Sequence, residues 1–278
     1  MRNILARANR EVLQQFAWSK VLLAFDYDGT LAPIVSKPDL AVLRPTTRRL
    51  LEELVRLYPC VVISGRAQRD LQRHLRGIGV REIVGNHGLE PWYATDKLAD
   101  VIAGWRPLLE ERLANLRGVT IEDKTFSVAI HYRQSREKKL ARNLILDTAR
   151  ALGAVRIVGG KQVVNILPNG APHKGIALER ERTRLECDTA IYVGDDDTDE
   201  DVFALDQPGQ LLSVRVEKRR SSAAAYFIEN QNQIDVLLRA LLELRREAGI
   251  PCRHRRTRKR DDSSAELQQR RRNRAGKE

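Results

Sequence analysis

Three short apolar runs of this chain each end in a polar cluster, and this pattern constrains the fold more than any other feature. The runs are Val21–Phe25, Cys60–Ile63 and Thr189–Val193, and the clusters that follow them are Asp26–Thr30, Ser64–Arg66 and Gly194–Asp197. Continuous apolar runs of this length are typical of strands buried on both faces of a parallel sheet. Since ligands bind beyond the carboxyl ends of such strands, we expect the three clusters to converge at one edge of the sheet.

The segments around these runs predict an α/β protein. An amphipathic helix is expected from about residue 46 to residue 58, where Pro59 ends it. Further strands are expected at Leu211–Val216 and Ala225–Ile228, and a closing helix over residues 234–242. Strands that alternate with amphipathic helices indicate a Rossmann-like, mainly parallel sheet covered on both faces.

The middle of the chain has a different pattern. It predicts one hairpin over Val119–Arg133 and a second over Val155–Leu167, with Gly159 and Gly160 at the second turn. Helices are expected at about residues 98–116 and 136–152. This alternation indicates an α+β layer inserted into the α/β domain.

The N-terminus and the cysteines favour a cytoplasmic protein. Charged residues interrupt the first apolar segment, which argues against a signal peptide, and the apolar residues from Ile4 to Phe16 instead share one helical face. No apolar run reaches the roughly 18 to 20 residues that span a bilayer, so we expect no membrane contact. Cys60, Cys187 and Cys252 share no metal-ligand spacing, and their odd number argues against a disulfide framework.

The net charge of +12 raises the question of a nucleic-acid partner. Of 49 basic and 37 acidic residues, 11 basic but only 4 acidic ones lie in the last segment, residues 251–278. That segment has few apolar residues, so we expect a disordered basic tail. It contains no Tyr, Phe or Trp on which bases could stack. A nucleic-acid-binding protein that uses this tail is therefore the less favoured alternative.

The acidic clusters suggest phosphate chemistry supported by a divalent cation. Asp26, Asp28 and Asp195 would repel one another at the sheet edge, and Mg²⁺, which prefers carboxylate and phosphate oxygens, would relieve that repulsion. A carboxylate can also attack phosphorus and form an aspartyl-phosphate. Lys174 and Ser64 are available to hold the phosphoryl oxygens. The simpler alternative is that acids after strands cap helices or form turns.

Four motifs resemble the set found in the haloacid dehalogenase-like phosphatases. They are Asp26-Tyr27-Asp28-Gly29-Thr30-Leu31, Ser64-Gly65-Arg66, Lys174-Gly175 and Gly194-Asp195-Asp196. The resemblance implies Asp26 as nucleophile and Asp28 as general acid and base. The Mg²⁺ ligands that it implies are Asp26, Asp195 and the backbone carbonyl of Asp28. It further implies that Ser64, Gly65 and Lys174 bind phosphate, with Lys174 also catalytic, and that Asp196 and Asp199 support the site from behind the ligands.

The spacing of these motifs places the inserted layer. Asp28 and Ser64 are 36 positions apart, which leaves room for a helix but for no further domain, whereas Ser64 and Lys174 are 110 positions apart. The layer therefore lies between the second and third motifs, where the resemblance implies the larger α+β cap of sugar-phosphate phosphatases. We expect a core domain over residues 1–88 and 169–250, a cap domain over residues 89–168 and the tail over residues 251–278.

Three longer segments resemble the trehalose-6-phosphate phosphatases. They are Gly85–Glu90, Glu122–Arg133 and Gly194–Phe203. The resemblance implies a monomeric enzyme of trehalose biosynthesis that hydrolyses a small-molecule sugar phosphate, trehalose 6-phosphate. The residues implied to contact this substrate are Arg66, Asn86, His87, Glu122, Lys124, His131, Arg133 and Asn165.

Strand alternation supports a polar face in the cap. His131 and Arg133 fall on one face of their strand beside two small residues, and Glu122 and Lys124 are one period apart on the strand before it. Such a face would suit sugar hydroxyls. The alternative is a solvated sheet face with ordinary ion pairs.

One departure from the family pattern leaves the sugar open. The cap strand before Pro168 carries Asn165 where the family usually has an acid, and an amide forms hydrogen bonds without a charge. A phosphatase for another sugar phosphate, such as sucrose phosphate or glucosylglycerate phosphate, is therefore the enzymatic alternative, and a phosphomutase is a more distant one.

Overall fold

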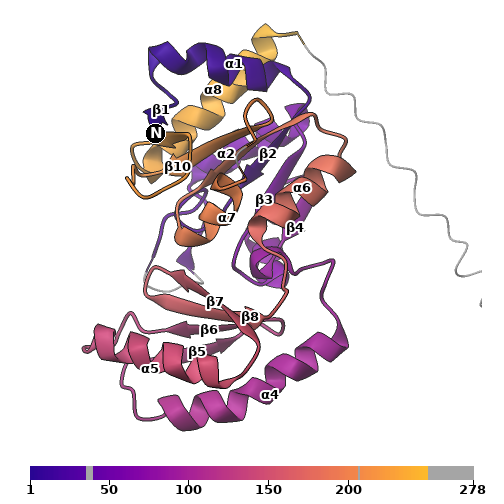
Figure 1. Ribbon diagram of the computed structural model, residues 1–278. Coiled ribbons are helices and arrows are strands. Elements are labelled where there is room, and N and C mark those ends of the chain that lie inside the picture. The colour runs from indigo at the N-terminus through magenta and orange to yellow at the C-terminus, as the bar shows by residue number, and fades with distance from the viewer. Residues whose placement is uncertain (36–39, 206, 250–278) are drawn as a thin grey trace, which may run out of the picture.

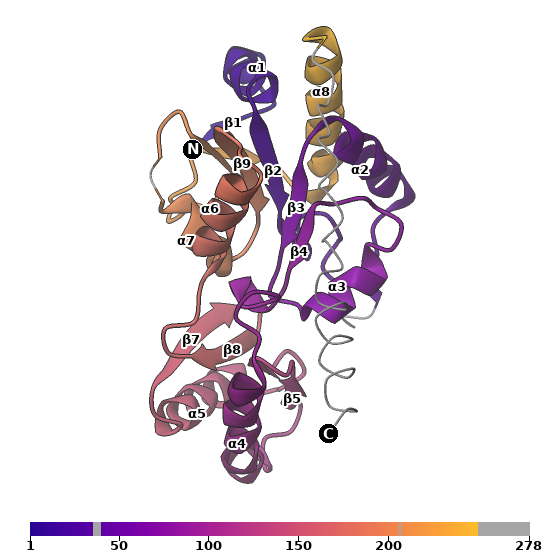
Figure 2. The same ribbon diagram turned by 90° about the vertical axis from the view of Figure 1, so that its right-hand side faces the viewer.

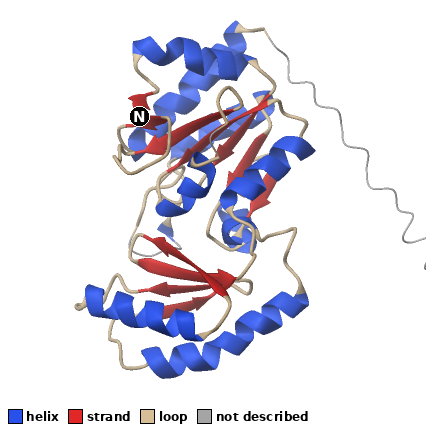
Figure 3. Ribbon diagram, viewed as in Figure 1, coloured by secondary structure: helices blue, strands red, loops and turns tan. Residues whose placement is uncertain are grey.

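The computed structural model describes residues 1–35, 40–205 and 207–249, which form two sheets with helices around them (Figures 1 and 3). Seven parallel strands make the large sheet, and four antiparallel strands make the small sheet. In spatial order the large sheet consists of β1 (Arg2–Asn3), β11 (Tyr226–Ile228), β10 (Leu211–Val216), β9 (Thr189–Gly194), β2 (Val21–Phe25), β3 (Cys60–Ile63) and β4 (Glu82–Val84). The small sheet consists of β5 (Thr120–Asp123), β6 (Val128–His131), β8 (Val163–Pro168) and β7 (Val155–Gly160).

Helices cover both faces of the large sheet, as Figure 2 shows, and the outer face of the small sheet. On one side of the large sheet lie α1 (Arg10–Trp18), α2 (Pro45–Leu57), α3 (Gln68–His74) and α8 (Ile234–Glu247). On the other side lie α6 (Lys174–Arg184) and α7 (Glu200–Phe203), while α4 (Asp96–Leu113) and α5 (Lys138–Ala151) pack on the small sheet. The short 3₁₀ helices are η1 (Arg7–Asn9), η3 (Asn86–Gly88), η4 (Asp197–Asp199) and η5 (Gln231–Gln233).

The prediction of a doubly covered parallel sheet is confirmed, and β2 shows its physical basis. Leu23 and Phe25 pack toward α2 and α8, whereas Leu22 and Ala24 pack toward α6 and α7. All four side chains are fully buried. A strand that is buried on both faces must be apolar at every position, which is why the run is continuous.

The middle strands β2 and β9 lie side by side in the large sheet. From β2 the chain moves outward through β3 to β4, and from β9 it moves outward through β10 to β11 on the opposite side. The strand order therefore reverses between β2 and β9. In open parallel sheets the loops at such a reversal diverge and leave a crevice at the carboxyl ends of the strands. The acidic clusters after β2 and β9 open into this crevice.

The small sheet lies between β4 and α6 in the chain and faces the carboxyl edge of the large sheet (Figure 1). Its apolar face is covered by side chains of α4 and α5, among them Trp105 and Ile145, which pack with Val128 and Ile130 of β6. The opposite face is left for polar residues because side chains alternate along a strand. This arrangement turns a polar wall toward the acidic edge.

The N-terminal helix is shorter than the amphipathic pattern predicts. Arg2 and Asn3 form β1, which pairs with Tyr226 and Phe227 of β11, and the α-helix begins only at Arg10. Ile4, next to β1, is 1% exposed and packs in the core without being helical. The amphipathic pattern overestimates the length of the helix because Arg2 and Asn3 pair with the distant strand β11 instead of continuing the helix.

The turn of the second hairpin lies two residues later than predicted. Gly159 and Gly160 are the last residues of β7, and the turn is formed by Lys161 and Gln162, where Gln162 has a φ of 64°. A Cβ atom at position 160 would lie 2.7 Å from the Val163 side chain. Glycine at position 160 therefore serves close packing across the hairpin instead of the turn itself.

Some sequence predictions fall partly beyond the described residues. The tail, residues 251–278, and Cys252 lie outside them. Cys60 and Cys187 are both buried. Within the described ranges, no helix is both long and apolar enough to cross a membrane.

Core packing under the large sheet can be tested on α8. Leu238 is fully buried in the cluster between α8 and the sheet, whereas Val236 on the same helix is 45% exposed. We expect Leu238→Ala to lower the free energy of unfolding by about 2 to 5 kcal/mol, since it removes buried methyl groups and leaves a cavity. Val236→Ala should change it by less than about 1 kcal/mol. Urea unfolding measures both values, and equal losses would show that α8 is not packed as described.

Candidate active site

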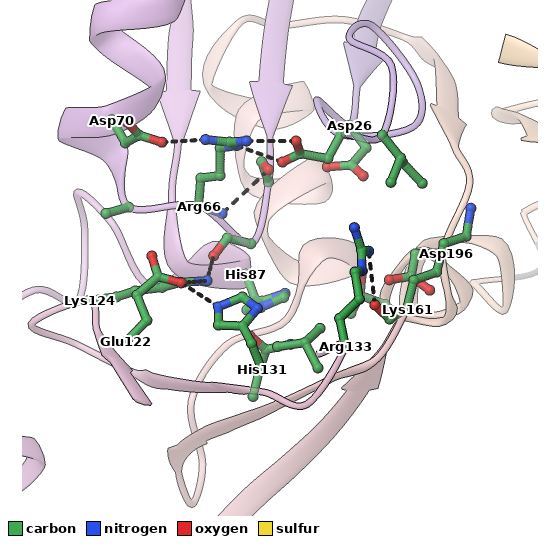
Figure 4. A pocket seen from close by; sticks show the side chains of 18 of the residues that line it. Asp26, Arg66, Asp70, His87, Glu122, Lys124, His131, Arg133, Lys161 and Asp196 are labelled. Atoms are coloured by element: carbon green, nitrogen blue, oxygen red, sulfur yellow. Dashed lines mark hydrogen bonds and ion pairs between the residues drawn. The ribbon is translucent and has the colours of Figure 1, made fainter. Parts of the chain in front are cut away.

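A cavity of about 900 Å³ lies between the carboxyl edge of the large sheet and the polar face of the small sheet (Figure 4). It collects residues from all four motifs and from both sheets. The sequence-predicted residues that line it are Asp26, Asp28, Ser64, Gly65, Arg66, His87, Glu122, Lys124, His131, Arg133, Asn165, Lys174, Asp195 and Asp196. Asn86 and Asp199, also predicted, are buried and are not among its lining residues.

The loop after β2 brings two acids against the loop after β9. Asp26 continues the ladder with a hydrogen bond from its N–H to the Val193 carbonyl at 2.9 Å. Gly29 then turns the chain with a φ of 80°, a value that L side chains rarely adopt. A Cβ atom at Gly29 would collide with the carboxylate of Asp195. Glycine at this position therefore allows Asp195 to approach the β2 loop.

Lys174 lies in the middle of a buried group of carboxylates. Its Nζ atom is 3.2 Å from Asp26 Oδ1 and 2.8 Å from Asp199 Oδ1, and its side chain is 1% exposed. Oxygen atoms of Asp26, Asp195 and Asp199 all lie within 4.8 Å of one another. Lys174 is the first residue of α6, whose N-terminus is capped by the His173 side chain. The start of this helix therefore places the lysine.

Asp199 holds this group together from behind the cavity wall. Its Oδ1 accepts hydrogen bonds from Lys174 and, at 2.6 Å, from the hydroxyl of Tyr192. Its Oδ2 accepts the backbone N–H groups of Asp195 and Asp196 at 2.8 and 2.9 Å. With both of its carboxylate oxygens hydrogen-bonded, Asp199 fixes the loop that carries Asp195.

Burial and mutual repulsion shift the ionisation of these groups. Burial raises the pKa of Asp26 well above its ordinary value of 3.8; Lys174 opposes this shift, and the charges of Asp199, Asp195 and Asp28 add to it. Burial and the charge of Asp199 raise the pKa of Asp195 to about 7, although Lys161 opposes this. Burial disfavours the charge of Lys174, but Asp199 and Asp26 together raise the pKa of the lysine above its ordinary value. Several carboxylates of the site thus surround the buried ammonium group of Lys174.

The carboxylate oxygens of this cluster are suitable ligands for a hard divalent cation. Asp26 Oδ1 and Asp195 Oδ1 are buried and accept no hydrogen bond from the described residues, and Lys174 is an ion-pair neighbour of the first. Buried carboxylate oxygens without donors are costly unless a cation compensates them. Carboxylates of this kind are the ligands that Mg²⁺ takes together with substrate phosphate. Asp26 and Asp195 are therefore the carboxylates best suited to a metal.

Arg66 binds the carboxylate of Asp28 with two hydrogen bonds. Nε and Nη2 donate to its two oxygens at 2.6 and 2.8 Å, and Nη1 donates to Asp70 at 2.6 Å. The guanidinium also lies 5.4 Å from the centre of the Tyr27 ring. Bidentate hydrogen bonds between a guanidinium and a carboxylate are among the strongest hydrogen bonds in proteins. Arg66, predicted to contact substrate, thus fixes the direction of Asp28.

Glu122, His131 and Asn165, three of the predicted substrate residues, lie on the polar face of the small sheet, and Lys124 and Arg133 lie just beyond its strand ends. Glu122 Oε2 lies 2.7 Å from His131 Nε2 and 4.0 Å from Lys124 Nζ (Figure 4). Burial alone would raise the pKa of Glu122, but its hydrogen bond with His131 and the charge of Lys124 bring it below its ordinary value. Arg133 donates to the carbonyls of Val35 and Lys161 at 3.0 and 3.2 Å. These residues form a charged wall opposite the acids.

His87 and Asn86 have different surroundings although they are neighbours. His87 is 5% exposed and lines the cavity, and neither ring nitrogen has a hydrogen-bond partner among the described residues. Burial, together with Lys174 and Lys124, lowers the pKa of His87 well below its ordinary value, so the ring is neutral. The Asn86 side chain instead donates to Glu90 and the Lys124 carbonyl and accepts from Ser127. Asn86 thus ties the small sheet to the large one.

Sequence reasoning missed Lys161. Its Nζ atom extends from the β7–β8 turn to Asp195 Oδ2 at 2.8 Å. Figure 4 shows Lys161 among the residues that line the cavity. Burial disfavours its charge, but Asp195 raises the pKa of Lys161 above its ordinary value. The glycines before Lys161 signalled a hairpin, but no local pattern tells which way the hairpin tip points.

Comparison with known proteins identifies the family. A family model described as trehalose-phosphatase matches residues 24–232, which is most of the chain. The chain belongs to the trehalose-phosphatase family. The resemblance inferred from the motifs is thereby confirmed, and members of this family are phosphatases, which are hydrolases.

Individual relatives agree with this membership. "Probable trehalose-phosphate phosphatase 4" of Oryza sativa subsp. japonica is 27% identical over 260 residues, which cover 86% of this chain and 70% of the relative. "Trehalose-phosphate phosphatase" of Mycobacterium bovis is 31% identical over 244 residues, covering 81% of this chain and 62% of the relative. The C-terminal domain of the trehalose-6-phosphate phosphatase of Candida albicans superposes with a TM-score of 0.72 at 22% identity, covering 85% of this chain and 98% of that one. The fold is thus that of the haloacid dehalogenase-like phosphatases, as predicted.

Removing the charge of Asp195 should stabilise the protein at neutral pH when chelator keeps divalent cations away. The pKa of Asp195 is about 7 in the folded chain and near its ordinary 3.8 in the unfolded chain. The folded state therefore binds this proton more tightly, and stability falls as the pH rises from about 4 to about 7. In EDTA, we expect Asp195→Asn to raise the free energy of unfolding at pH 8 by up to about 4 kcal/mol.

The effect should be much smaller at pH 4, where the carboxyl of the folded wild type is protonated. Asp147→Asn is the control because Asp147 is 67% exposed on α5. It should have little effect at either pH. Thermal or urea unfolding at both pH values measures the difference, and an Asp195→Asn effect that is independent of pH would contradict the buried-charge account.

Proposed function

We propose that this protein hydrolyses trehalose 6-phosphate to trehalose and phosphate with the help of Mg²⁺. The observation that carries the proposal is a single cavity in which the Asp26, Lys174 and Asp195 cluster faces the charged wall of the small sheet. Its volume of about 900 Å³ is within the range of pockets that enclose drug-sized ligands, and a disaccharide phosphate is of that size. Family membership supports the reaction class, and the names of the relatives support the sugar.

Two domains would carry out this function. We assign the large sheet to a core domain over residues 1–88 and 169–250, and the small sheet to a cap domain over residues 89–168. Individual hydrogen bonds join the two domains in the structure. One of them runs from Lys124 Nζ to the Gly65 carbonyl at 2.9 Å. Cap movement around these contacts would admit substrate and then exclude bulk water.

In the first half-reaction, a carboxylate oxygen of Asp26 attacks phosphorus. The bond between phosphorus and the sugar oxygen breaks, Asp28 gives its proton to that oxygen, and trehalose leaves. Lys174, the Ser64 hydroxyl and the Gly65 backbone would hold the phosphoryl oxygens and offset their charge. The product of this step is an aspartyl-phosphate on Asp26.

In the second half-reaction, Asp28 acts as base. It takes a proton from a water molecule whose oxygen attacks phosphorus, the bond to Asp26 breaks, and inorganic phosphate is released with Asp26 restored. Asp28 can act first as acid and then as base because the proton that it takes from water restores its original protonation state. The bidentate pair with Arg66 holds the Asp28 carboxyl group in one orientation at the cavity.

Asp26 and Asp195, with the backbone carbonyl of Asp28, would hold Mg²⁺. When bound, the ion supplies positive charge that offsets the charge of the transferring phosphoryl group. Asp199 keeps Asp195 in place through the backbone N–H groups, and Asp196 contributes by capping η4. The ligands are thus held by residues that do not themselves need to touch the ion.

Measurement of phosphate release tests the proposal. Trehalose 6-phosphate should be hydrolysed with Mg²⁺ and should not be hydrolysed in EDTA. Sucrose 6-phosphate and glucosylglycerate phosphate should be poorer substrates, and free phosphate should be the product instead of an isomeric sugar phosphate. Preference for either of the other sugars would overturn the assignment of trehalose 6-phosphate as the substrate, while metal-independent turnover would overturn the mechanism.

Asp26→Asn tests the nucleophile. The amide keeps the size of the side chain but is a poor nucleophile, so we expect phosphate release to fall by about a thousandfold or more. Thermal unfolding should show an intact fold. Phosphate release near the wild-type rate would rule out a covalent route through this residue.

Glu122→Ala tests the role of the charged wall. Glu122 is 46% exposed in the cavity and 2.7 Å from His131, so it is accessible to a sugar hydroxyl. Loss of one charged contact should lower kcat/KM for trehalose 6-phosphate by about 10- to 150-fold. Hydrolysis of a small aryl phosphate, which cannot reach this wall, should change little. Equal losses for both substrates would mean that Glu122 supports the fold or the phosphate site and does not select the sugar.

A further inference from the structure

Arg215 is a buried residue of β10 that no motif of the site includes. It pairs in register with Gly194 of β9, the residue just before Asp195, and is 4% exposed. Its Nη2 donates to the backbone carbonyl of Asp195 at 2.6 Å, and its Nη1 donates to that of Asp196 at 3.1 Å. A single guanidinium thus binds two successive peptide carbonyls of the loop that carries the acids.

This loop is held from two sides. Asp199 accepts the N–H groups of Asp195 and Asp196, and Arg215 donates to the carbonyls of the same two residues. Backbone groups bound on both sides leave the segment little freedom to rotate. The direction of the Asp195 carboxylate, which shares the acidic cluster with Asp26, follows from the orientation of this backbone.

The charge of Arg215 is compensated outside the cavity. Glu200, at the start of α7, accepts a hydrogen bond from Nη1 at 2.8 Å, and its other oxygen accepts the N–H of Ala223. Burial of a charged group lowers stability unless an opposite charge and hydrogen-bond partners compensate it. The fork geometry of arginine, with parallel donors, suits two adjacent acceptors better than lysine does.

We propose that Arg215 is a positioning residue for the cation site. It orients the peptide units of Asp195 and Asp196 so that the Asp195 carboxylate is presented to the cation together with Asp26. This inference rests on the proposed Mg²⁺-dependent function. Arg215 does not touch the ion or the substrate, so its loss acts on metal affinity through Asp195.

The experiment compares Mg²⁺ affinity in variants of two arginines at different places. Arg215→Met removes the hydrogen bonds to Asp195, Asp196 and Glu200, and Arg215→Lys keeps the charge but can form only part of them. Arg245→Met is the matched control, because Arg245 is also buried and donates to two carbonyls, those of Ala17 and Ser19 at 3.1 and 3.2 Å. Arg245 belongs to α8, on the far side of the large sheet from α6 and α7.

Titration calorimetry of the metal-free full chain with MgCl₂ gives the affinity without any turnover. Partners behind metal ligands typically contribute 10- to 100-fold to affinity, so we expect Arg215→Met to bind Mg²⁺ about 10- to 100-fold more weakly. Arg215→Lys should show a smaller loss, and Arg245→Met should stay within about twofold of the wild type since distant sites act independently. The increase in Tm with MgCl₂ should follow the same order.

Two outcomes overturn the inference alone. In one, the wild type binds Mg²⁺ and Asp195→Asn loses it, but both Arg215 variants bind like the wild type. In the other, Arg245→Met weakens binding as much as Arg215→Met, which would mean that lost stability is the cause. If Arg215→Met does not fold, Arg215→Lys decides. A wild type that hydrolyses trehalose 6-phosphate without affinity for Mg²⁺ would overturn the metal site and this inference together.

Discussion

A buried ion pair between Lys174 and two carboxylates lies where β2, β9 and α6 meet, and the surrounding structure compensates its cost. Burial of charge is unfavourable unless each group is paired and hydrogen-bonded. Asp199 meets this condition fully, with Lys174, the Tyr192 hydroxyl and two backbone N–H groups as donors. Asp26 and Asp195 meet it only in part, since each keeps a buried oxygen that accepts no hydrogen bond from the described residues. The incomplete compensation is what makes this cluster suitable for a cation and for attack on phosphorus.

The small sheet is held against this cluster by short, specific contacts. Lys161 pairs with Asp195, Lys124 donates to the Gly65 carbonyl, and Arg133 donates to the Val35 carbonyl. Each of these residues follows the end of a small-sheet strand by one or two positions and lines the cavity. Side chains that could recognise a sugar therefore also hold the two sheets against each other.

Residues that hold other site residues in place are a second theme of the site. Arg66 holds Asp28, Asp199 holds the loop of Asp195, and Asn86 ties the two sheets together. A site tolerates little displacement of its reacting groups, so such supporting residues matter as much as those that touch substrate. The family resemblance implies that Arg66 and Asn86 contact substrate, and this stays a prediction. In the structure Arg66 binds Asp28, and Asn86 binds Glu90 and Ser127.

The sequence by itself determined the fold class, the order of the motifs and the place of the inserted layer, because continuous apolar runs, helical periodicity and spacing are local properties of the chain. It also predicted that Asp26, Asp28 and Asp195 converge, since the carboxyl ends of parallel strands share one edge. The place of Lys174 beside them was implied only by the family resemblance. Only the tertiary structure decided the start of α1, the position of the second hairpin turn, and the roles of Lys161 and Arg215. These depend on partners far away in the chain, such as β11 for Arg2 and the Asp195 loop for Arg215, and no local pattern encodes which distant backbone groups a side chain will meet.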